Sequence, residues 1–355
     1  MRVAVLSSTP ASPTEGSGTF VALDGLIRGL TRLGHAVAFR PLRLRTGFHT
    51  LDRWLYNVDA VVRPLEGDVV VGVDLDGFLW ARRRGRGTRV PFVVALKGII
   101  ADELRNERGW IRMLLGVQAR WERANVHRAD RVVVPSHYSA AVAAEVYGIP
   151  AARLAVVPEP IDLAEWRRRF AAAARRTSTR PTVLSVARMY PRKRLGDLLH
   201  AAALLRERIP DVQVRIVGTG PEANGLRRLH RDLALGETVV LLGDVSRARL
   251  SVEYVSADCF CLPSVQEGFG LVFAEAMAAG LPVVACREAA VPEIVVDRRT
   301  GLLVSRERPD ELALALETML MDHGLRKDFA DEARRRVEAY DLERVAAAFL
   351  ESLPA

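Results

Sequence analysis

Short apolar runs alternate along this chain with longer segments in which apolar residues recur every three or four positions. The run at 3–6 predicts a buried strand, because no polar residue interrupts it. The segment that follows predicts an amphipathic helix, which Gly34 would end. The apolar positions of that helix are Leu23, Leu26, Ile27, Leu30 and Leu33.

The alternation continues through the first half and restarts near residue 182. Further strands are predicted at 37–39, 69–73, 92–96, 132–134 and 155–157, with helices at 111–125 and 139–146. The second series has strands at 182–187, 212–217, 239–242, 259–262, 282–285 and 302–304, and helices at 195–207, 222–235, 271–279 and 309–321. Strands that are apolar almost throughout and separated by helices indicate parallel sheets covered on both faces. Two such series predict an α/β protein with two Rossmann-like domains.

A change of composition marks the expected domain boundary. Residues 164–181 are polar and rich in arginine, and they end at Pro181 just before a new strand. We therefore predict a linker there, between a first domain at 1–165 and a second at 166–339. The segment 340–355 predicts a closing helix with an apolar stripe, which must be buried against another element.

Composition and charge narrow the class of protein. Hydrophobic residues make up 49% of the 355 positions and charged residues 26%, which excludes disordered and fibrous proteins. The formal net charge is +8. Only three of the 51 basic residues are lysines, Lys97, Lys193 and Lys327, so heavy use of arginine explains part of the excess. No nucleic-acid-binding motif accompanies the charge, and we expect no nucleic-acid partner.

The cysteines and the apolar segments indicate a compartment. Cys259, Cys261 and Cys286 are an odd number that builds no disulfide framework, which is typical of a reducing cytoplasm. The apolar run at 3–6 is too short for a signal peptide, and no segment approaches the roughly 18 apolar residues of a membrane span. We expect a cytoplasmic protein. The basic run at 82–89 would suit docking on an anionic membrane surface, although a solvated loop explains it as well.

The strongest chemical signal lies at 263–284, which reads as strand end, glycine loop, helix, glycine stop and strand. Gly268 and Gly270 remove side chains where a backbone can approach a ligand. The helix that starts near Gly270 presents free N–H groups and the positive end of its dipole, which suits a phosphate. Glu267 in the loop and Glu275 one turn into the helix can both face that ligand.

Two more strand ends carry candidate ligand groups. Arg188 and Lys193 lie in a cationic turn directly after the strand at 182–187, and the open end of a parallel strand is where doubly wound sheets bind ligands. Both could neutralise a diphosphate without a metal ion. Gly218 and Gly220 form another glycine turn between a strand and a helix, which alone would be an ordinary turn.

Together these motifs resemble the family 4 retaining glycosyltransferases, which have the GT-B fold. Glu267 and Glu275, with seven residues between them, match the most specific motif of that family. Arg188 and Lys193 match its diphosphate-binding pair. The resemblance is close over about 181–331. It is looser in the first half, where it rests on the loop from Gly16 to Gly18 and on the segments 34–37 and 129–136.

The resemblance implies a fold and an activity. It implies two Rossmann-like domains that face each other across a cleft, with residues 340–355 crossing back to the first, acceptor-binding domain. The implied donor is a nucleoside diphosphate sugar, and the acceptor a glycan, a lipid-linked glycan or a small molecule. No cofactor and no metal ion are implied. Fixed cations would meet the negative charge that develops on the leaving diphosphate.

The resemblance also implies a role for each matched residue. Glu275 would hold the ribose hydroxyls and Glu267 the transferred sugar, while Arg188 and Lys193 would stabilise the diphosphate. Other donor-binding positions would be Gly268, Phe269, Gly270, Leu271, Gly218, Gly220, Gly16 and Gly18. The two glutamates would not act as a glycosidase acid and nucleophile, because the family is thought to retain configuration by front-face departure and attack.

This chain departs from the family pattern in the first domain. Lys97 stands where many members carry a catalytic histidine, and the segment 156–162, with Glu159, replaces the usual Pro-Asn-Gly-Val-Asp. We expect Lys97 to touch the phosphate or the sugar, or to receive an acidic acceptor. Asp74 and Asp76 imitate the metal-binding Asp-x-Asp of another glycosyltransferase fold. We interpret them as loop or acceptor-side residues and expect no metal site there.

Two interpretations from other classes stay open. A nucleotide-sugar epimerase on a similar fold would need acid and base residues in the first domain, where Lys97 replaces the histidine. A protein that binds a nucleotide sugar without turnover would have kept the second domain and lost the chemistry of the first. A dehydrogenase is disfavoured, because the loop between Gly16 and Gly18 lacks the G-x-G-x-x-G spacing.

Overall fold

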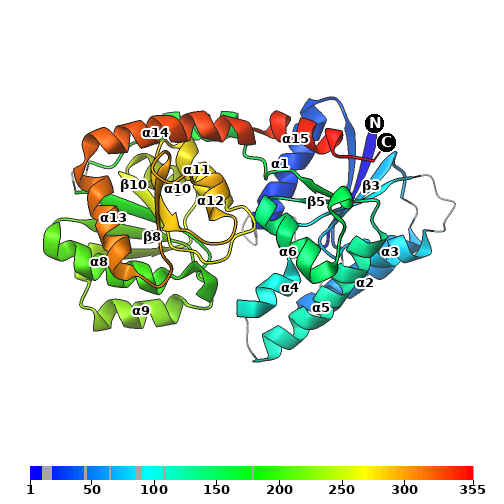
Figure 1. Ribbon diagram of the computed structural model, residues 1–355, viewed down its shortest axis with the longest axis horizontal. Helices are drawn as coiled ribbons and strands as arrows, with labels where there is room; N and C mark the ends of the chain where they lie inside the picture. The colour runs from blue at the N-terminus through cyan, green and yellow to red at the C-terminus, as the bar shows by residue number, and fades with distance from the viewer. Residues whose placement is uncertain are drawn as a thin grey trace. The chain divides into compact units, whose positions relative to one another are not determined.

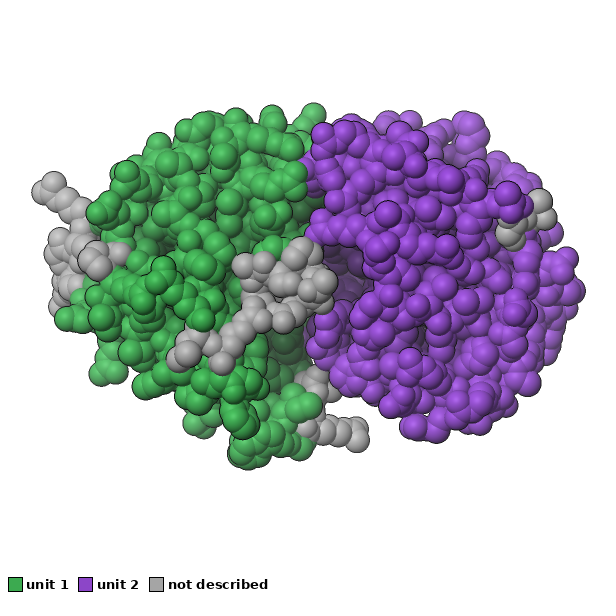
Figure 2. Space-filling view, turned by 180° about the vertical axis from the view of Figure 1, so that it is seen from behind, with its two compact units in different colours: residues 1–161, 340–355 green, residues 162–339 purple. Residues whose placement is uncertain are grey.

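A computed structural model describes residues 1–9, 18–43, 46–63, 65–84, 90–106, 109–177 and 180–354. The chain divides into two compact units (Figures 1 and 2). Unit 1 comprises Met1–Ile161 and Tyr340–Ala355, and unit 2 comprises Asp162–Ala339. Unit 1 is therefore built from two stretches of sequence, with the whole of unit 2 between them.

Unit 1 is organised around a six-stranded parallel sheet with strand order β2-β1-β3-β4-β5-β6. The strands are β1 (Arg2–Leu6), β2 (Ala36–Arg40), β3 (Val69–Val73), β4 (Phe92–Ala95), β5 (Arg131–Val134) and β6 (Leu154–Val156). In the register Val5 pairs with Phe39 on one side and with Val71 on the other. The central strands β3 and β4 are buried at every position, as expected for a parallel sheet covered on both faces.

Helices cover both faces of this sheet (Figure 1). They are α1 (Gly18–Arg32), α2 (His49–Val62), α3 (Phe78–Arg83), α4 (Ile100–Glu103), η1 (Leu104–Asn106), α5 (Gly109–Arg128), α6 (His137–Tyr147) and η2 (Ala151–Arg153). Local signals set the bounds of α6. The Ser136 side chain accepts a hydrogen bond from the Ser139 amide at its start, and Gly148 ends it with a φ of 66°.

Unit 2 repeats the plan with strand order β12-β11-β10-β7-β8-β9, all parallel. Its strands are β7 (Thr182–Val186), β8 (Gln213–Val217), β9 (Val239–Gly243), β10 (Cys259–Leu262), β11 (Val283–Cys286) and β12 (Gly301–Val304). Its helices are α7 (Leu163–Ala172), η3 (Pro191–Lys193), α8 (Leu195–Arg208), α9 (Ala223–Asp232), η4 (Gly236–Thr238), α10 (Arg247–Val255), α11 (Leu271–Ala278), α12 (Val291–Ile294), α13 (Pro309–Met321) and α14 (His323–Val337), with η5 (Glu338–Tyr340) at the unit boundary.

A buried ion pair stabilises the outer part of this second sheet. Arg215 of β8 donates two hydrogen bonds, of 2.6 and 2.9 Å, to the carboxylate of Glu253 on α10. Both residues are buried, so Arg215 depends on Glu253 for compensation, while Glu253 also accepts a hydrogen bond of 2.8 Å from Arg249.

The last helix, α15 (Leu342–Glu351), belongs to unit 1 and lies beside α1 (Figure 1). Val345, Ala346 and Phe349, on its apolar stripe, are buried against the sheet face that α1 also covers. Gly29 allows the close approach, because a Cβ atom there would lie 2.5 Å from the carbonyl oxygen of Leu342.

The predicted linker differs from what the structure contains. Residues 164–181 include most of α7, and the change of unit falls between Ile161 and Asp162, so the predicted boundary at 165 lies inside a helix. The rings of Trp166 and Phe170 pack against Tyr254 of α10. Arg167, Arg168 and Arg169, which made the segment look like a linker, lie on this helix, and its aromatic residues pack on α10.

In the described ranges, no helix combines the length and the apolar character that crossing a membrane requires.

Candidate functional site

The predicted donor-binding residues of unit 2 lie in loops that follow three neighbouring strands, at one edge of the sheet. Strands β10, β7 and β8 lie side by side and are parallel, so the loops after Leu262, Val186 and Val217 leave from the same edge. These loops carry the glutamate motif, the cationic turn and the glycine turn. This edge is where doubly wound sheets bind ligands.

Lys193 and Glu267 meet at this edge. The Lys193 ammonium donates to Glu267 Oε1 at 2.5 Å, and only 13% and 10% of the two side chains are exposed. The backbones of the two loops are also joined, because the Val265 amide donates to the Arg192 carbonyl at 2.9 Å. Lys193 is therefore not a lysine of a solvated turn: it is held against the carboxylate that the sequence motif singles out.

Arg188 lies on the same turn and is exposed. Its guanidinium carbon is 6.0 Å from the ring centroid of Tyr190, and that of Arg192 is 4.9 Å from the same ring. The ring thus holds two guanidinium groups by cation–π contacts. Together with Lys193 they make a short, strongly cationic turn next to Glu267.

The glycine turn after β8 packs directly on this cationic turn. Gly218 and Gly220 have φ of 117° and 159°. A Cβ atom at Gly218 would lie 2.1 Å from the Ala187 carbonyl oxygen, and one at Gly220 would lie 2.7 Å from the Met189 amide nitrogen. The Met189 amide also donates to the Thr219 carbonyl at 2.8 Å. These glycines are required because two loop backbones run in contact, which sets the shape of the edge.

The loop after β10 leads into the N-terminus of α11. Gly270 precedes the helix with a φ of 92°, and a Cβ atom there would lie 2.6 Å from the Phe273 ring. No side chain caps this end, so its first amide N–H groups and the positive end of the helix dipole remain directed at the loop. Gly268 and the buried Phe269 lie in the loop, and Leu271 is the first helical residue.

Glu275 lies in the second turn of α11 and has a different partner. Its Oε2 accepts a hydrogen bond of 2.9 Å from the hydroxyl of Tyr254, which is fully buried. Burial raises the pKa of Glu275 to about 7, although Tyr254 and two nearby arginines, Arg247 and Arg169, lower it. No hydrogen bond or ion pair joins the described side chains of Glu275 and Glu267.

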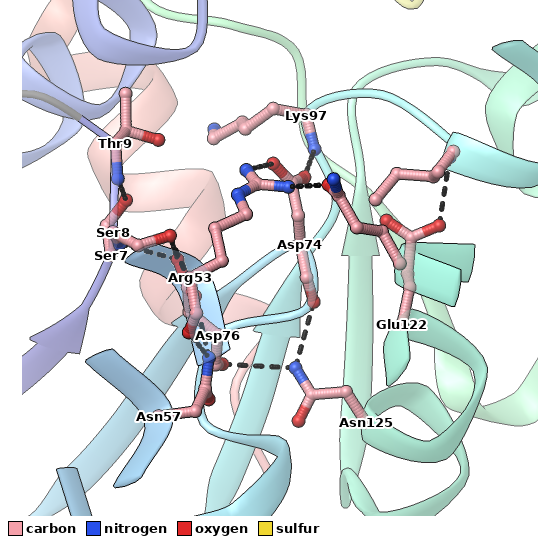
Figure 3. Close-up of polar contacts among 12 residues, drawn as sticks. Ser7, Ser8, Thr9, Arg53, Asn57, Asp74, Asp76, Lys97, Glu122 and Asn125 are labelled. Atoms are coloured by element: carbon pink, nitrogen blue, oxygen red, sulfur yellow. Dashed lines mark hydrogen bonds and ion pairs between the residues drawn. The ribbon is translucent and has the colours of Figure 1, made fainter. Parts of the chain in front are cut away.

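In unit 1, a buried polar cluster occupies the carboxyl ends of β1, β3 and β4 (Figure 3). The Asp76 carboxylate accepts hydrogen bonds from the Ser8 amide at 2.5 Å, the Ser8 hydroxyl at 2.7 Å and the Asn57 amide at 3.1 Å. Asn125 donates to the backbone carbonyls of Asp74 and Asp76. Burial raises the pKa of Asp76 to about 6, with Arg53 opposing the shift.

Asp74 faces the next loop in this cluster. Its Oδ1 accepts a hydrogen bond of 2.8 Å from the Lys97 amide, and Arg53 lies 4.0 Å from its Oδ2 (Figure 3). Asp74 has a φ of 54°, which is rare for a residue with a side chain. Burial raises its pKa, and Arg53 and Lys97 oppose the shift. Asp74 thus contacts the loop after β4, and Asp76 contacts the loop after β1. In the described ranges, no cluster of three or more metal-ligating side chains occurs.

Lys97 forms a nearly buried ion pair with Glu159. Its ammonium donates to Glu159 Oε2 at 2.7 Å, and 10% and 6% of the two side chains are exposed. Burial raises the pKa of Glu159, while Lys97 lowers it. Both residues line a small cavity at the carboxyl ends of β4, β5 and β6. Nearby, the Glu122 carboxylate accepts from the Ile100 amide at 2.9 Å and from the Tyr147 hydroxyl.

Comparison with known proteins places this chain in a family. Residues 167–336 match the model of glycosyl transferases group 1, and residues 2–165 match that of glycosyltransferase family 4. The chain belongs to the family 4 glycosyltransferases. This result confirms the resemblance that the glutamate and Arg/Lys motifs indicated.

Relatives of this family 4 glycosyltransferase are named for different substrates. A GDP-mannose-dependent alpha-(1-6)-phosphatidylinositol monomannoside mannosyltransferase of Mycolicibacterium smegmatis is 33% identical over 236 residues, which is 63% of this chain and 61% of the relative. A D-inositol 3-phosphate glycosyltransferase of Mycobacteroides abscessus is 37% identical over 213 residues, or 57% of this chain and 47% of the relative. The chain thus spans about three fifths or less of these two relatives.

Solved structures confirm the predicted GT-B fold of this family member. Sucrose-phosphate synthase from Thermosynechococcus elongatus superimposes with a TM-score of 0.81 over 99% of this chain and 97% of that one, at 21% identity. A glycosyltransferase involved in lipopolysaccharide biosynthesis gives a TM-score of 0.73 over 99% of each chain, at 18% identity.

The remaining predicted positions are placed as follows. Gly16 lies outside the described residues. Gly18 is the first residue of α1 and is exposed, with open space where a side chain would stand. Of the basic run at 82–89, Arg84 pairs with Asp130 at 2.7 Å, and 85–89 lie outside the described residues.

Sequence reasoning missed three residues that the structure joins to the predicted site residues. Tyr254 and Arg53 gave no signal, because each meets its partner only through the fold. Glu159 carried a weak one: it is an acidic residue between two prolines directly after a predicted strand.

Proposed function

We propose that this protein is a retaining, metal-independent glycosyltransferase that moves a sugar from a nucleoside diphosphate sugar to a hydroxyl of a glycan, a lipid-linked glycan or a small molecule. The observation that carries the proposal is the contact between Lys193 and Glu267 at the edge of the second sheet. It joins the cation assigned to the leaving diphosphate and the carboxylate assigned to the sugar.

The charges at this edge suit the chemistry of glycosyl transfer. The reaction builds positive charge at the anomeric carbon and negative charge on the departing diphosphate. Arg188, Lys193 and the free N-terminus of α11 supply positive potential from three neighbouring elements. On this proposal they take the place of a divalent cation at the diphosphate oxygens, and the Lys193 ammonium turns from Glu267 toward the phosphate.

The two glutamates have separate tasks in this proposal. Ionised Glu275 accepts hydrogen bonds from the two ribose hydroxyls, with Tyr254 fixing its orientation. Glu267, at the loop that precedes α11, accepts from hydroxyls of the transferred sugar. Neither attacks the anomeric carbon, so configuration is kept by departure and attack on the same face.

A first donor to test is GDP-mannose. The support is the name of the Mycolicibacterium smegmatis relative, a GDP-mannose-dependent mannosyltransferase that is 33% identical over the matched part. Two sets of relatives are named for inositol-bearing acceptors, so inositol derivatives belong in the acceptor panel.

We also propose that unit 1 docks on an anionic membrane surface through α5 and the start of α2. Trp110, Ile111 and Met113 of α5 are more than half exposed. The exposed charged residues of α5 are arginines (Arg112, Arg120, Arg123 and Arg128), whereas its acidic residue, Glu122, is buried. Apolar side chains beside arginines are what an interfacial helix presents to anionic lipid.

A second set of exposed apolar side chains lies at the start of α2. Phe48, Leu51 and Trp54, at the start of α2, are exposed. A hydrogen bond of 2.8 Å between Gln118 of α5 and Thr50 of α2 joins the two helices. Lipid-linked acceptors would be presented at such a surface.

The test is donor binding and turnover with EDTA present. Calorimetry with GDP-, UDP- and ADP-sugars is expected to show one preferred base, with binding lost in Glu275→Ala and weakened at least about tenfold in Arg188→Ala. Arg228→Ala, an exposed arginine on α9, is the matched control and is expected to bind normally. NMR of the released or transferred sugar is expected to show the anomeric configuration of the donor.

Each alternative class predicts a different result. Absence of binding to every donor would overturn the proposal. Binding without turnover on a broad acceptor panel would favour a non-catalytic binding protein, and conversion of the bound sugar to its epimer would favour an epimerase.

A further inference from the structure

The ion pair between Lys97 and Glu159 is formed by two residues that lie far apart in the sequence. Lys97 follows β4 and Glu159 follows β6, so the contact spans the end of β5, which lies between those strands. Charged side chains are rarely buried unless they are paired, because each loses its hydration. This pair lines a cavity about the size of one water molecule, at the carboxyl ends of β4, β5 and β6.

Both partners are held by rigid backbone. The Lys97 amide donates to the Asp74 carboxylate at 2.8 Å, which fixes the loop that carries the lysine. Glu159 stands between Pro158 and Pro160, whose rings restrict the chain on either side. The 2.7 Å contact therefore joins two side chains whose backbones are both restrained.

The Lys97 ammonium is compensated locally. Glu159 supplies the carboxylate that contacts it, Asp74 accepts from its backbone amide, and Arg53 lies 4.0 Å from Asp74 and also interacts with Asp76. The three carboxylates of Glu159, Asp74 and Asp76 thus outnumber the two cations. An anion that approached Lys97 would find no excess positive charge, and it would have to compete with Glu159 for the ammonium.

We propose that Glu159 determines specificity by neutralising Lys97, so that this lysine donates hydrogen bonds to neutral hydroxyl groups of a substrate and rejects phosphate or carboxylate groups. An ammonium has three N–H donors, and Glu159 engages one, which leaves the others for a ligand hydroxyl. Replacement of Glu159 by a neutral residue leaves the Lys97 ammonium without a carboxylate in contact among the described residues and opens the position to anions. The identity of that hydroxyl as a substrate group rests on the proposed function; the rejection of anions does not.

The chain is suited to a direct test, because it has only three lysines. Labelling with lysine carrying ¹³C at Cε gives three NMR signals, which Lys97→Arg and Lys327→Arg assign. Inorganic phosphate is titrated into wild type and Glu159→Gln. The internal reference is Lys327, an exposed lysine 2.9 Å from Asp331, and Asp331→Asn is the matched control at that exposed pair.

The expected result is a change of anion response at one lysine. In wild type the Lys97 signal stays unchanged with phosphate, whereas in Glu159→Gln it moves and phosphate binds at least about tenfold more tightly there. Asp331→Asn changes neither Lys97 nor its response. Glu159→Asp, which keeps the charge, restores the insensitivity of Lys97.

Two outcomes would overturn the proposal. One is a wild-type Lys97 signal that follows phosphate, which requires no variant to fold. The other is a Glu159→Gln protein with an unchanged melting temperature whose Lys97 signal and phosphate response match those of wild type. Neither measurement uses turnover, so failure here is distinguishable from failure of the glycosyltransferase proposal. If turnover is found, Glu159→Gln is expected to shift the kcat/KM ratio toward a phosphorylated acceptor over its neutral parent.

Discussion

The hydrogen bond between Tyr254 and Glu275 predicts how donor binding depends on pH. The pKa of Glu275 is about 7, against an ordinary value of 4.5, because burial disfavours its charged form. If ionised Glu275 accepts the ribose hydroxyls, affinity rises as pH increases through 7. At pH 6 about a tenth of the protein is ionised at this position, so binding is expected to be roughly tenfold weaker than on the plateau above pH 8.

Removal of the tyrosine hydroxyl moves this profile. The Tyr254 hydroxyl lowers the pKa of Glu275, because it donates to the carboxylate. Tyr254→Phe is therefore expected to raise that pKa by about one unit or more, since a hydrogen bond to a charged group contributes roughly 1.5–3 kcal/mol net. At pH 7 the variant binds the donor several-fold more weakly, and above pH 9 it approaches the wild-type affinity.

Folding stability responds to the same group in the opposite direction. The pKa is raised in the folded state, so the folded protein holds this proton more tightly than the unfolded chain does, and stability falls as pH rises between about 4.5 and 7. Glu275→Gln has no carboxylate to titrate, so this part of the pH dependence of stability is absent. The free energy of unfolding by urea, measured at pH 5 and pH 8 for wild type and Glu275→Gln, gives the contribution of Glu275.

The binding assay is calorimetry with GDP, or with the diphosphate that the donor screen selects, at pH values from 5.5 to 9. The matched ligand is its 2′,3′-dideoxy analogue, which has the same base and phosphates and lacks the ribose hydroxyls. The ratio of the two affinities isolates the contribution of Glu275. An identical pH dependence for both ligands, or a midpoint that Tyr254→Phe does not move, would refute this reasoning.

Three further substitutions have expected outcomes. Trp110→Ser is expected to weaken flotation with phosphatidylglycerol vesicles by roughly tenfold, because an exposed ring no longer enters the interface, whereas Leu314→Ser on α13 has no effect. Gly218→Ala is expected to destabilise the protein by about 2 kcal/mol in thermal unfolding. Gly225→Ala is the control and is expected to leave stability unchanged, because the nearest atom to a Cβ there would lie 3.9 Å away. Glu253→Gln is expected to lower stability by about 3 kcal/mol in urea, because the buried guanidinium of its β8 partner loses its counter-charge. Melting temperatures equal to that of wild type would contradict the last two predictions.

The sequence was most informative where apolar runs are continuous. The strand predicted at 69–73 coincides with β3, and 259–262 coincides with β10, because a strand covered on both faces needs apolar residues at every position. Helix α7 was missed for the converse reason. Its arginine-rich exposed face dominates its composition, and the aromatic contacts that hold it are made with a helix encountered much later in the chain.

In the candidate site, too, contacts between residues far apart in the sequence could not be predicted. The motif around Glu267 was visible because loop, helix and glutamates are consecutive. The partners of the key residues were not, because Lys97 and Glu159 are separated by 62 positions and Lys193 and Glu267 by 74. From the sequence, Gly218 was consistent with an ordinary turn. The structure shows why a glycine is needed: a Cβ atom there would lie 2.1 Å from the carbonyl oxygen of Ala187 in the next loop.

The placement of α15 on α1 has a consequence for synthesis of the chain. The first 161 residues cannot complete their own fold when they leave the ribosome, because the helix that covers Gly25 and Gly29 is translated only after residue 340. Unit 2 is continuous and can complete its fold first. Until the last helix arrives, the part of α1 around Gly25 and Gly29 stays open to water.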